Sequence, residues 1–307
     1  MKIALLTVFD ENYREIADRT LPSMRRYADT FGLELLIMKP ETQDRPAHWG
    51  RITRIREVLQ SGFEYCFYVD PDAMFVRFDE DIRDHITAAK DLYLCWHSPN
   101  NSESYSPIPA HFSTGVMVWR NCAWSIDFLD EIWRQTDFIH HFWTEQAAML
   151  NLLGYRSRLG LGGSDDPDPD RIAHVQNLSV DWNVLVGHTI GPDPIIRHVA
   201  GRSYALRLVG LDHENAFQTM REMLPANARH LLSRQLNLMS YQMQQAEDQV
   251  KNAARESGNE KLHAENAMRQ AEQVLAEHKA LLRSRTRLAR AWWCAVLWKL
   301  GIRRAPY

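Results

Sequence analysis

The sequence has few cysteines, little net charge and no long hydrophobic run. Its 307 residues contain four cysteines, and their spacing fits neither a zinc motif nor a disulfide framework, which indicates free thiols in a reducing compartment: Cys66, Cys95, Cys122 and Cys294. A net charge of −3 is too small to indicate nucleic acid as a partner. No apolar stretch approaches the ~20 residues of a membrane span, and Met1-Lys2 leads into a short apolar run rather than a signal peptide. We therefore expect a cytoplasmic protein.

Acidic residues are absent from the C-terminal end of the chain. No Asp or Glu follows Glu277, whereas eight basic residues do: Lys279, Arg283, Arg285, Arg287, Arg290, Lys299, Arg303 and Arg304. This change in composition predicts a globular domain over residues 1–225, a helical or coiled-coil segment over 226–282 and a basic, Trp-rich tail over 283–307.

Within the globular part, apolar runs of strand length alternate with segments of helical periodicity. The expected strands cover residues 2–9, 33–38, 65–69, 92–96 and 112–119, and the expected helices cover 11–30, 51–60, 124–134 and 144–153. Such alternation predicts an α/β fold with a mainly parallel sheet and helices on both faces.

The most informative segment is 65–76, an apolar strand that runs directly into Asp70 and Asp72. Open α/β sheets bind their ligands at the carboxyl ends of the strands. Two carboxylates there suit a divalent cation that keeps positions free for phosphate oxygens. For an isolated Asp-x-Asp the simpler interpretation is more common: Asp70 caps a turn and Asp72 faces solvent.

Four further polar segments accompany this pair, in a fixed order along the chain. They are the strand 112–121 with Ser113 and Gly115 near its start, the helix head Trp143-Thr144-Glu145-Gln146, the segment Asp181-Trp182-Asn183, and the strand 195–198 that ends in His198 and is followed by Gly201 and Arg202. A Gly within a strand lets a ligand approach the backbone closely.

In order and spacing, these segments and His48-Trp49-Gly50-Arg51 resemble the GT-A glycosyltransferases over residues 1 to about 205. The most similar family is that of the retaining α-galactosyl-, α-mannosyl- and xyloglucan xylosyltransferases, glycosyltransferase family 34, with kinship to the glycogenin-like family. The resemblance implies a Rossmann-like GT-A domain. It also implies retaining transfer of a galactose-like hexose from a nucleotide sugar, UDP-linked, to a glycan or lipid-linked acceptor.

The resemblance also implies a role for individual residues. Asp70, Asp72 and His198 would ligate Mn²⁺ or Mg²⁺, and the imidazole favours Mn²⁺. Thr7 and Phe9 would lie near the nucleobase and ribose, and Arg51, Gly201 and Arg202 near the diphosphate. Ser113 and Gly115 would face the donor sugar, and Glu145 and Gln146 would lie beside the anomeric carbon. Arg202 departs from the family pattern, because relatives often carry Cys there, or a Lys further on.

Each of these residues also has a simpler interpretation. His198 can be a core histidine, Arg51 a surface cation and Thr7 a packing residue of the sheet. Glu145 can be an acid that the dipole of the helix favours in the first turn.

Two other functions fit parts of the sequence. Haloacid-dehalogenase phosphatases also place Asp-x-Asp after an apolar strand, but Met74 stands where that motif has Thr or Val. A catalytically inactive, membrane-tethered scaffold is the second alternative.

The C-terminal segments carry no expected chemistry. A thin, Ala-rich heptad pattern runs from Leu236 to Leu281 and is interrupted at residues 257–260, so a dimeric coiled coil and an intramolecular helical hairpin are both compatible with it. The tail 283–307 has the pattern of an interfacial helix on the inner face of a membrane, although its Trp face could instead pack against protein.

Overall fold

The structure is a computed structural model that describes residues 1–256 except 103, 105–109 and 161–163. The chain divides into two compact units, Met1–Tyr241 and Gln242–Tyr307. The domain boundary near residue 225 stays a prediction. The basic tail and the second half of the heptad pattern lie outside the described residues.

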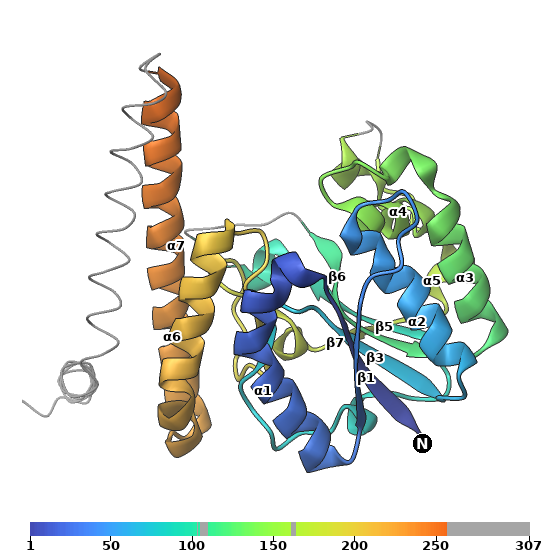
Figure 1. The fold of residues 1–307 in the computed structure, drawn as a ribbon, viewed down its shortest axis with the longest axis horizontal. Coiled ribbons are helices and arrows are strands. Elements are labelled where there is room, and N and C mark those ends of the chain that lie inside the picture. Colours follow the sequence, from blue (N-terminus) through green and yellow to red (C-terminus); the bar gives the residue numbers. More distant parts are fainter. Residues whose placement is uncertain (103, 105–109, 161–163, 257–307) are drawn as a thin grey trace, which may run out of the picture. The chain divides into compact units, whose positions relative to one another are not determined.

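The first unit is built around a six-stranded sheet with the order β2-β1-β3-β6-β5-β7 (Figure 1). Its strands are β1 (Ile3–Val8), β2 (Glu34–Met38), β3 (Tyr65–Val69), β5 (Leu92–His97), β6 (His111–Arg120) and β7 (Val175–Leu178). β6 runs antiparallel to both of its neighbours, and the other pairs are parallel. The predicted mainly parallel sheet is confirmed; β7 had not been expected.

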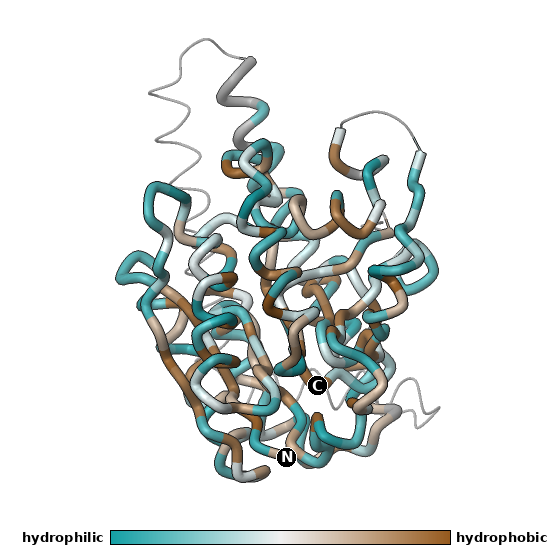
Figure 2. Tube along the Cα trace, turned by 90° about the vertical axis from the view of Figure 1, so that its right-hand side faces the viewer, coloured by the Kyte–Doolittle hydropathy of each residue, from teal (hydrophilic) through white to brown (hydrophobic). Residues whose placement is uncertain are grey.

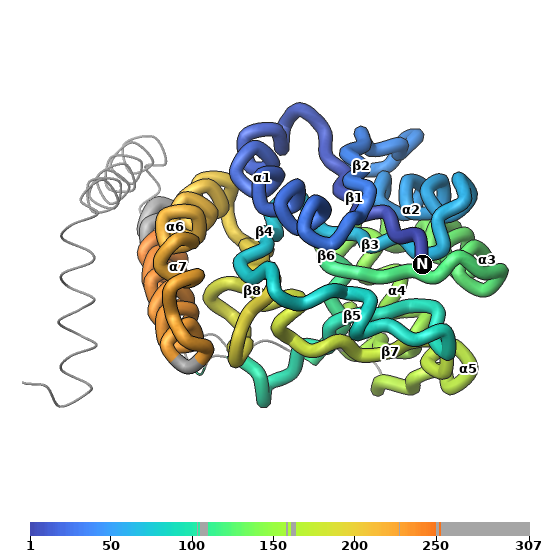
Figure 3. The backbone as a smooth tube through the Cα atoms, turned by 90° about the horizontal axis from the view of Figure 1, so that it is seen from below, coloured from blue at the N-terminus to red at the C-terminus, as the bar shows by residue number. Residues whose placement is uncertain are grey.

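Successive residues of the central strands are buried on opposite faces of the sheet, and both faces are apolar. On one face lies α1 (Arg14–Phe31), and on the other lie α2 (Gly50–Gln60), α3 (Ala123–Arg134) and α4 (Thr144–Leu152). Figures 1 and 3 show this three-layer arrangement, with the strands between α1 and α2. The predicted helices on both faces are therefore confirmed.

The helix α1 shows how the sequence produces this layering. Its apolar residues recur at helical spacing, and Ile16, Leu21, Met24 and Tyr27 are all buried. Figure 2 shows hydrophobic and hydrophilic residues interspersed along the coiled segments of the chain. The helix ends at Gly32, whose φ of 63° is the left-handed conformation that glycine adopts without steric cost.

A second, three-stranded sheet connects the Asp pair to the C-terminal part of the unit. It has the order β4-β9-β8, with β4 (Ala73–Phe75), β8 (Val184–Leu185) and β9 (Ile196–His198). β4 and β9 are antiparallel, and their register places Ala73 opposite His198. The expected strand that ends in His198 is confirmed, and its partner strand starts directly after Asp72.

Two longer helices follow, α6 (Tyr204–Met223) and α7 (Ala226–Glu256). The short helix α5 (Pro169–Ile172) precedes β7. α6 was not anticipated from the sequence, and the part of α7 inside the first unit buries Leu232, Leu236 and Asn237. None of the helices in the described ranges is both long and apolar enough to cross a membrane.

Candidate active site

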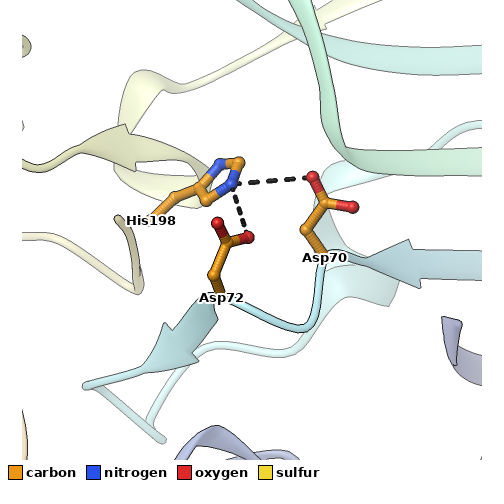
Figure 4. A group of neighbouring side chains, drawn as sticks. All are labelled: Asp70, Asp72 and His198. Carbon is orange, nitrogen blue, oxygen red and sulfur yellow. Dashed lines mark hydrogen bonds and ion pairs between the residues drawn. The ribbon is translucent and has the colours of Figure 1, made fainter. Parts of the chain in front are cut away.

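Three potential metal ligands converge where β3 ends (Figure 4). Asp70 directly follows β3, Asp72 directly precedes β4, and His198 is the last residue of β9. His198 Nε2 lies 3.1 Å from Asp72 Oδ1 and 3.6 Å from Asp70 Oδ2, and one ligand atom from each residue lies within 4.8 Å of the others. Two carboxylates and an imidazole fit a hard or borderline divalent cation such as Mg²⁺ or Mn²⁺.

Gly115 makes this convergence possible. A Cβ atom at this position would lie 2.2 Å from His198 Cε1 and 3.0 Å from Asp70 Oδ2. The pairing of β5 with β6 shifts register between Leu94 and Cys95, so β6 bulges next to the site. Bulges commonly redirect side chains beside active sites. The glycine predicted from the Ser-Thr-Gly segment therefore has a physical reason: the imidazole fills the space of a side chain.

Asp70 is held rigidly by its neighbours. Tyr68 donates its hydroxyl proton to Oδ1 over 2.6 Å, and the Arg51 guanidinium contacts Oδ1 at 3.1 Å and Oδ2 at 3.3 Å. The same guanidinium lies 3.2 Å from Glu145 Oε1. Burial alone would lower the pKa of Arg51, but Asp70 and Glu145 raise it above its usual value, so Arg51 stays charged. It is a buried partner of the Asp pair rather than a surface cation.

Glu145 and Gln146 lie in the first turn of α4, next to Arg51 and Thr114. Glu145 is 1% exposed, and its Oε2 accepts a hydrogen bond of 2.6 Å from Thr144. Gln146 Oε1 accepts one of 3.1 Å from the backbone N–H of Thr114. Thr144 adopts a φ of 46°, which is rare for a β-branched residue and typical of functional sites.

These residues line one cavity of about 490 Å³, a size typical of small-molecule sites. The predicted site residues that line it are Phe9, Arg51, Asp70, Asp72, Ser113, Gly115, Glu145, Gln146, His198 and Gly201. Thr7 and Arg202 are not among its lining residues. Thr7 is fully buried, and its hydroxyl has no hydrogen-bond partner within the described part of the chain. Arg202 Nη2 donates to the carbonyl of Val186 over 3.2 Å.

Arg207 is the cation that sequence reasoning missed. It lies in the second turn of α6, lines the cavity, and places Nη1 3.3 Å from Asp72 Oδ2 while donating to the Tyr13 hydroxyl. Burial alone would raise the pKa of Asp72, but His198 and Arg207 lower it below its usual value. The carboxylate is therefore ionised. Ser203, whose hydroxyl caps α6, was the sequence signal that could have located this helix.

Aromatic and imidazole side chains that had no predicted role form another part of the cavity wall. His111 stacks on Trp143 with ring centroids 5.2 Å apart, and Phe142 beside it is 77% exposed. His188 also lines the cavity, and burial lowers its pKa to about 4. His188 is therefore neutral at pH 7 and adds no positive charge to this wall.

No protein-family model matches the chain. Two curated relatives match, both named "Probable glycosyltransferase 6", from Oryza sativa subsp. indica and subsp. japonica, each 30% identical over 115 residues. The match covers 36% of this chain, and the chain spans about a quarter (23%) of the length of these relatives.

Several solved structures are similar to this chain at low sequence identity. A glycosyltransferase involved in the glycosylation of the major capsid of PBCV-1 matches with a TM-score of 0.49 and 16% identity, over 69% of this chain and 100% of that one. The galactosyltransferase LgtC, in complex with donor and acceptor sugar analogs, has a TM-score of 0.44 and 11% identity over 72% of this chain and 96% of that one. Membership of glycosyltransferase family 34 stays a prediction, but the predicted resemblance to glycosyltransferases is confirmed by the curated relatives.

Proposed function

We propose that this protein is a metal-dependent glycosyltransferase, which moves a galactose-like hexose from a nucleotide sugar to a glycan or lipid-linked acceptor with retention of configuration. The observation that carries the proposal is the convergence of Asp70, Asp72 and His198 at the carboxyl end of β3, inside a cavity that Arg207 also lines. The match to the rice glycosyltransferases supports the reaction class.

The donor binds in this cavity. Asp70, Asp72 and His198 hold Mn²⁺ or Mg²⁺, which when bound neutralises charge on the leaving diphosphate. Arg207 is placed to contact the diphosphate as well, since a guanidinium matches phosphate oxygens in its geometry. Phe9 lies on the nucleobase side, and UDP is the proposed carrier.

The sugar lies toward β6 and α4. Ser113 and Gly115 line its side of the cavity. Because Gln146 Oε1 accepts from the Thr114 backbone, the amide N–H groups of Gln146 are left to donate to a sugar hydroxyl near the anomeric carbon. Glu145 contacts Arg51, Thr144 and Thr114, so its role is to hold Arg51 rather than to attack the sugar.

The reaction needs no enzymic base. The bond between the anomeric carbon and the diphosphate oxygen breaks, the acceptor oxygen bonds to that carbon on the same face, and the acceptor proton passes to a leaving phosphate oxygen. The protein contributes orientation and electrostatic stabilisation, which account for much of the rate enhancement in such reactions.

The rival phosphatase mechanism would use Asp70 as a nucleophile. Both Asp70 oxygens contact Arg51, and one also accepts the Tyr68 proton; these contacts draw electron density from the carboxylate and make it a weaker nucleophile. No observation on the described residues favours this alternative over sugar transfer.

Calorimetric titration of UDP and GDP with and without Mn²⁺ tests the proposal. We expect affinity that depends on the metal, followed by Mn²⁺-dependent hydrolysis of one nucleotide sugar in a screen of UDP- and GDP-sugars. Absence of any metal-linked nucleotide affinity would support the inactive scaffold. Turnover of a generic phosphate ester would support the phosphatase.

We propose two interactions for the C-terminal region. The heptad pattern mediates dimerisation, and residues 283–307 bind peripherally to a membrane. Deleting residues 283–307 and measuring partition onto anionic vesicles tests the second. Unchanged partition of the shortened protein would contradict it.

A further inference from the structure

A chain of buried polar groups leads away from the metal ligands and returns to the cavity. His198 Nδ1 lies 3.0 Å from Asn183 Oδ1, and Asn183 Nδ2 lies 3.0 Å from Ser113 Oγ. Asn183 is fully buried and His198 is 3% exposed, so water does not compete for these contacts. Ser113 Oγ also accepts a hydrogen bond of 3.3 Å from the backbone N–H of Gly115.

The direction of these hydrogen bonds decides which nitrogen of His198 carries its proton. An amide oxygen can only accept, so Asn183 Oδ1 requires the proton on Nδ1 of a neutral imidazole. When a cation is held by Asp70 and Asp72, Nε2 then offers its lone pair to it, as a metal ligand must. Without a cation, Nε2 lies 3.1 Å from Asp72 Oδ1, and a proton on Nε2 is donated to that carboxylate. The reversed amide would require the proton on Nε2, which would point at the two carboxylates and block metal coordination.

In the structure, Asn183 Nδ2 and the backbone N–H of Gly115 both donate to Ser113 Oγ. A hydroxyl oxygen that receives both hydrogen bonds uses its two lone pairs, and its own proton is left to donate. Ser113 lines the cavity, so that proton is available to an oxygen of a bound molecule. The Asn183 amide therefore connects Ser113 of the cavity wall with the imidazole of His198.

We propose that Asn183 is a positioning residue that holds His198 in the Nδ1–H form, so that Nε2 is free to bind the metal. This inference rests on the proposed metal-dependent function. Partners of this kind commonly orient metal-bound histidines, and their loss typically costs 10–100-fold in metal affinity.

The tautomer can be measured without substrate, in the metal-bound protein. In protein labelled with ¹⁵N-histidine and saturated with diamagnetic Mg²⁺, long-range ¹H–¹⁵N spectra distinguish protonated from unprotonated ring nitrogens, and the His198→Gln variant identifies the His198 signals. We expect a protonated Nδ1 and an unprotonated Nε2 at pH 8. A protonated Nε2 in the neutral ring would overturn the inference, whether or not any variant folds.

Two variants then test the role of the amide. Asn183→Leu removes both hydrogen bonds, and we expect mixed tautomers and Mn²⁺ affinity about 10–100-fold weaker by calorimetry. Asn183→Asp keeps an acceptor for the Nδ1 proton and should retain the tautomer and most of the affinity. Wild-type affinity and a single tautomer in Asn183→Leu would contradict the proposal.

Asn121→Leu is the matched control. Asn121 donates from its side-chain amide to the carbonyls of Leu59 and Phe63 and does not line the cavity. Its loss should lower stability without changing the His198 tautomer or Mn²⁺ affinity. If the wild-type protein binds neither Mn²⁺ nor Mg²⁺, the proposed function fails; if it binds the metal while Nε2 stays protonated, only the present inference fails.

Discussion

Two groups of buried arginines and carboxylates in the first unit differ in what surrounds them. The pocket cluster consists of Arg51, Asp70 and Glu145, and all three line the cavity. The helix cluster consists of Arg197, Glu214 and Arg221. In it, Glu214 Oε1 lies 2.5 Å from Arg197 Nε and Oε2 lies 2.5 Å from Arg221 Nη2.

The difference lies in the balance of charge. The pocket cluster has two carboxylates to one arginine and is extended by Asp72 with its partner Arg207, so three carboxylates face two arginines and an excess of negative charge lies beside open space. The helix cluster has two arginines to one carboxylate, is at most 1% exposed, and does not line the cavity. Excess negative charge next to a cavity suits the binding of a cation. The helix cluster is closed to solvent and instead joins β9 to α6. Burial of charge alone therefore does not identify a functional site.

The largest expected effect comes from removing a ligand beside the pocket cluster. Asp72→Ala should lower sugar transfer about a thousandfold, because a cation that stabilises a leaving group supplies several kcal/mol of barrier reduction. Metal-dependent nucleotide binding should be lost in calorimetry while thermal unfolding stays near wild type. Asp130→Ala, which removes a carboxylate paired with Arg56 outside the cavity, serves as the control. Normal transfer by Asp72→Ala, or by wild type in excess chelator, would refute the metal assignment.

Breaking the helix cluster should affect stability instead. Glu214→Gln leaves two buried guanidiniums without a counter-charge and should lower the free energy of unfolding by about 3–5 kcal/mol in urea titrations. Glu222→Gln breaks an exposed pair with Arg26 and should cost less than about 1 kcal/mol. Similar stabilities of these two variants would show that the helix cluster contributes little.

Gly115→Ala tests whether close packing brings the ligands together. The added methyl group would overlap the His198 ring, and a displacement of about 1 Å at a reacting centre can cost a hundredfold in rate. Mn²⁺ affinity should fall as well. In Gly62→Ala the new Cβ meets open space, although φ is 96°, so only stability should change. Unchanged Mn²⁺ affinity in Gly115→Ala would mean that His198 is not a ligand.

A smaller effect should separate the two candidate diphosphate cations. Arg207→Ala should weaken Mn²⁺-dependent nucleotide binding about 10–100-fold, as expected for a lost hydrogen bond to a charged group. Arg202→Ala should change stability more than nucleotide affinity, because Arg202 is buried against the carbonyl of Val186. The reverse result would restore the role that the family resemblance assigned to Arg202.

The smallest effect concerns pH. Burial alone would raise the pKa of Glu214, but Arg197 and Arg221 lower it below the ordinary value of 4.5. Around and below pH 4.5 the unfolded chain therefore binds more protons at this site, so stability rises with pH and is lost as pH falls toward the folded-state pKa. Glu214→Gln should lack this part of the acid dependence in urea titrations between pH 3 and 6. Parallel curves for variant and wild type would contradict it.

The sequence predicted the layers of the fold well, because each depends on local periodicity. The helices α1 to α4 and five of the six strands of the main sheet were anticipated in type and position. β7, β4, β8 and α6 were not. Three of these four are strands of two to four residues, too short to show periodicity. α6 has an N-terminal cap at Ser203, but its buried residues include the polar His213, Glu214 and Arg221, which interrupt an apolar pattern.

The candidate site was predictable in part. Asp70 and Asp72 follow an apolar strand, so their position at the sheet edge could be inferred locally. His198 is 126 residues from Asp72, and it was named by family resemblance rather than by any pattern near it. Arg207 was not anticipated, because the cap at Ser203 was overlooked and its helix was not recognised.

The sequence by itself determined the α/β layering and the place of the Asp pair, since both follow from the spacing of apolar residues along short segments. The tertiary structure decided which side chains share the cavity. The antiparallel register of β4 and β9 brings His198 to the aspartates, the missing side chain of Gly115 leaves room for the ring, and the direction of α6 places Arg207 beside Asp72. These contacts join residues far apart in the chain, and no local periodicity encodes such pairings.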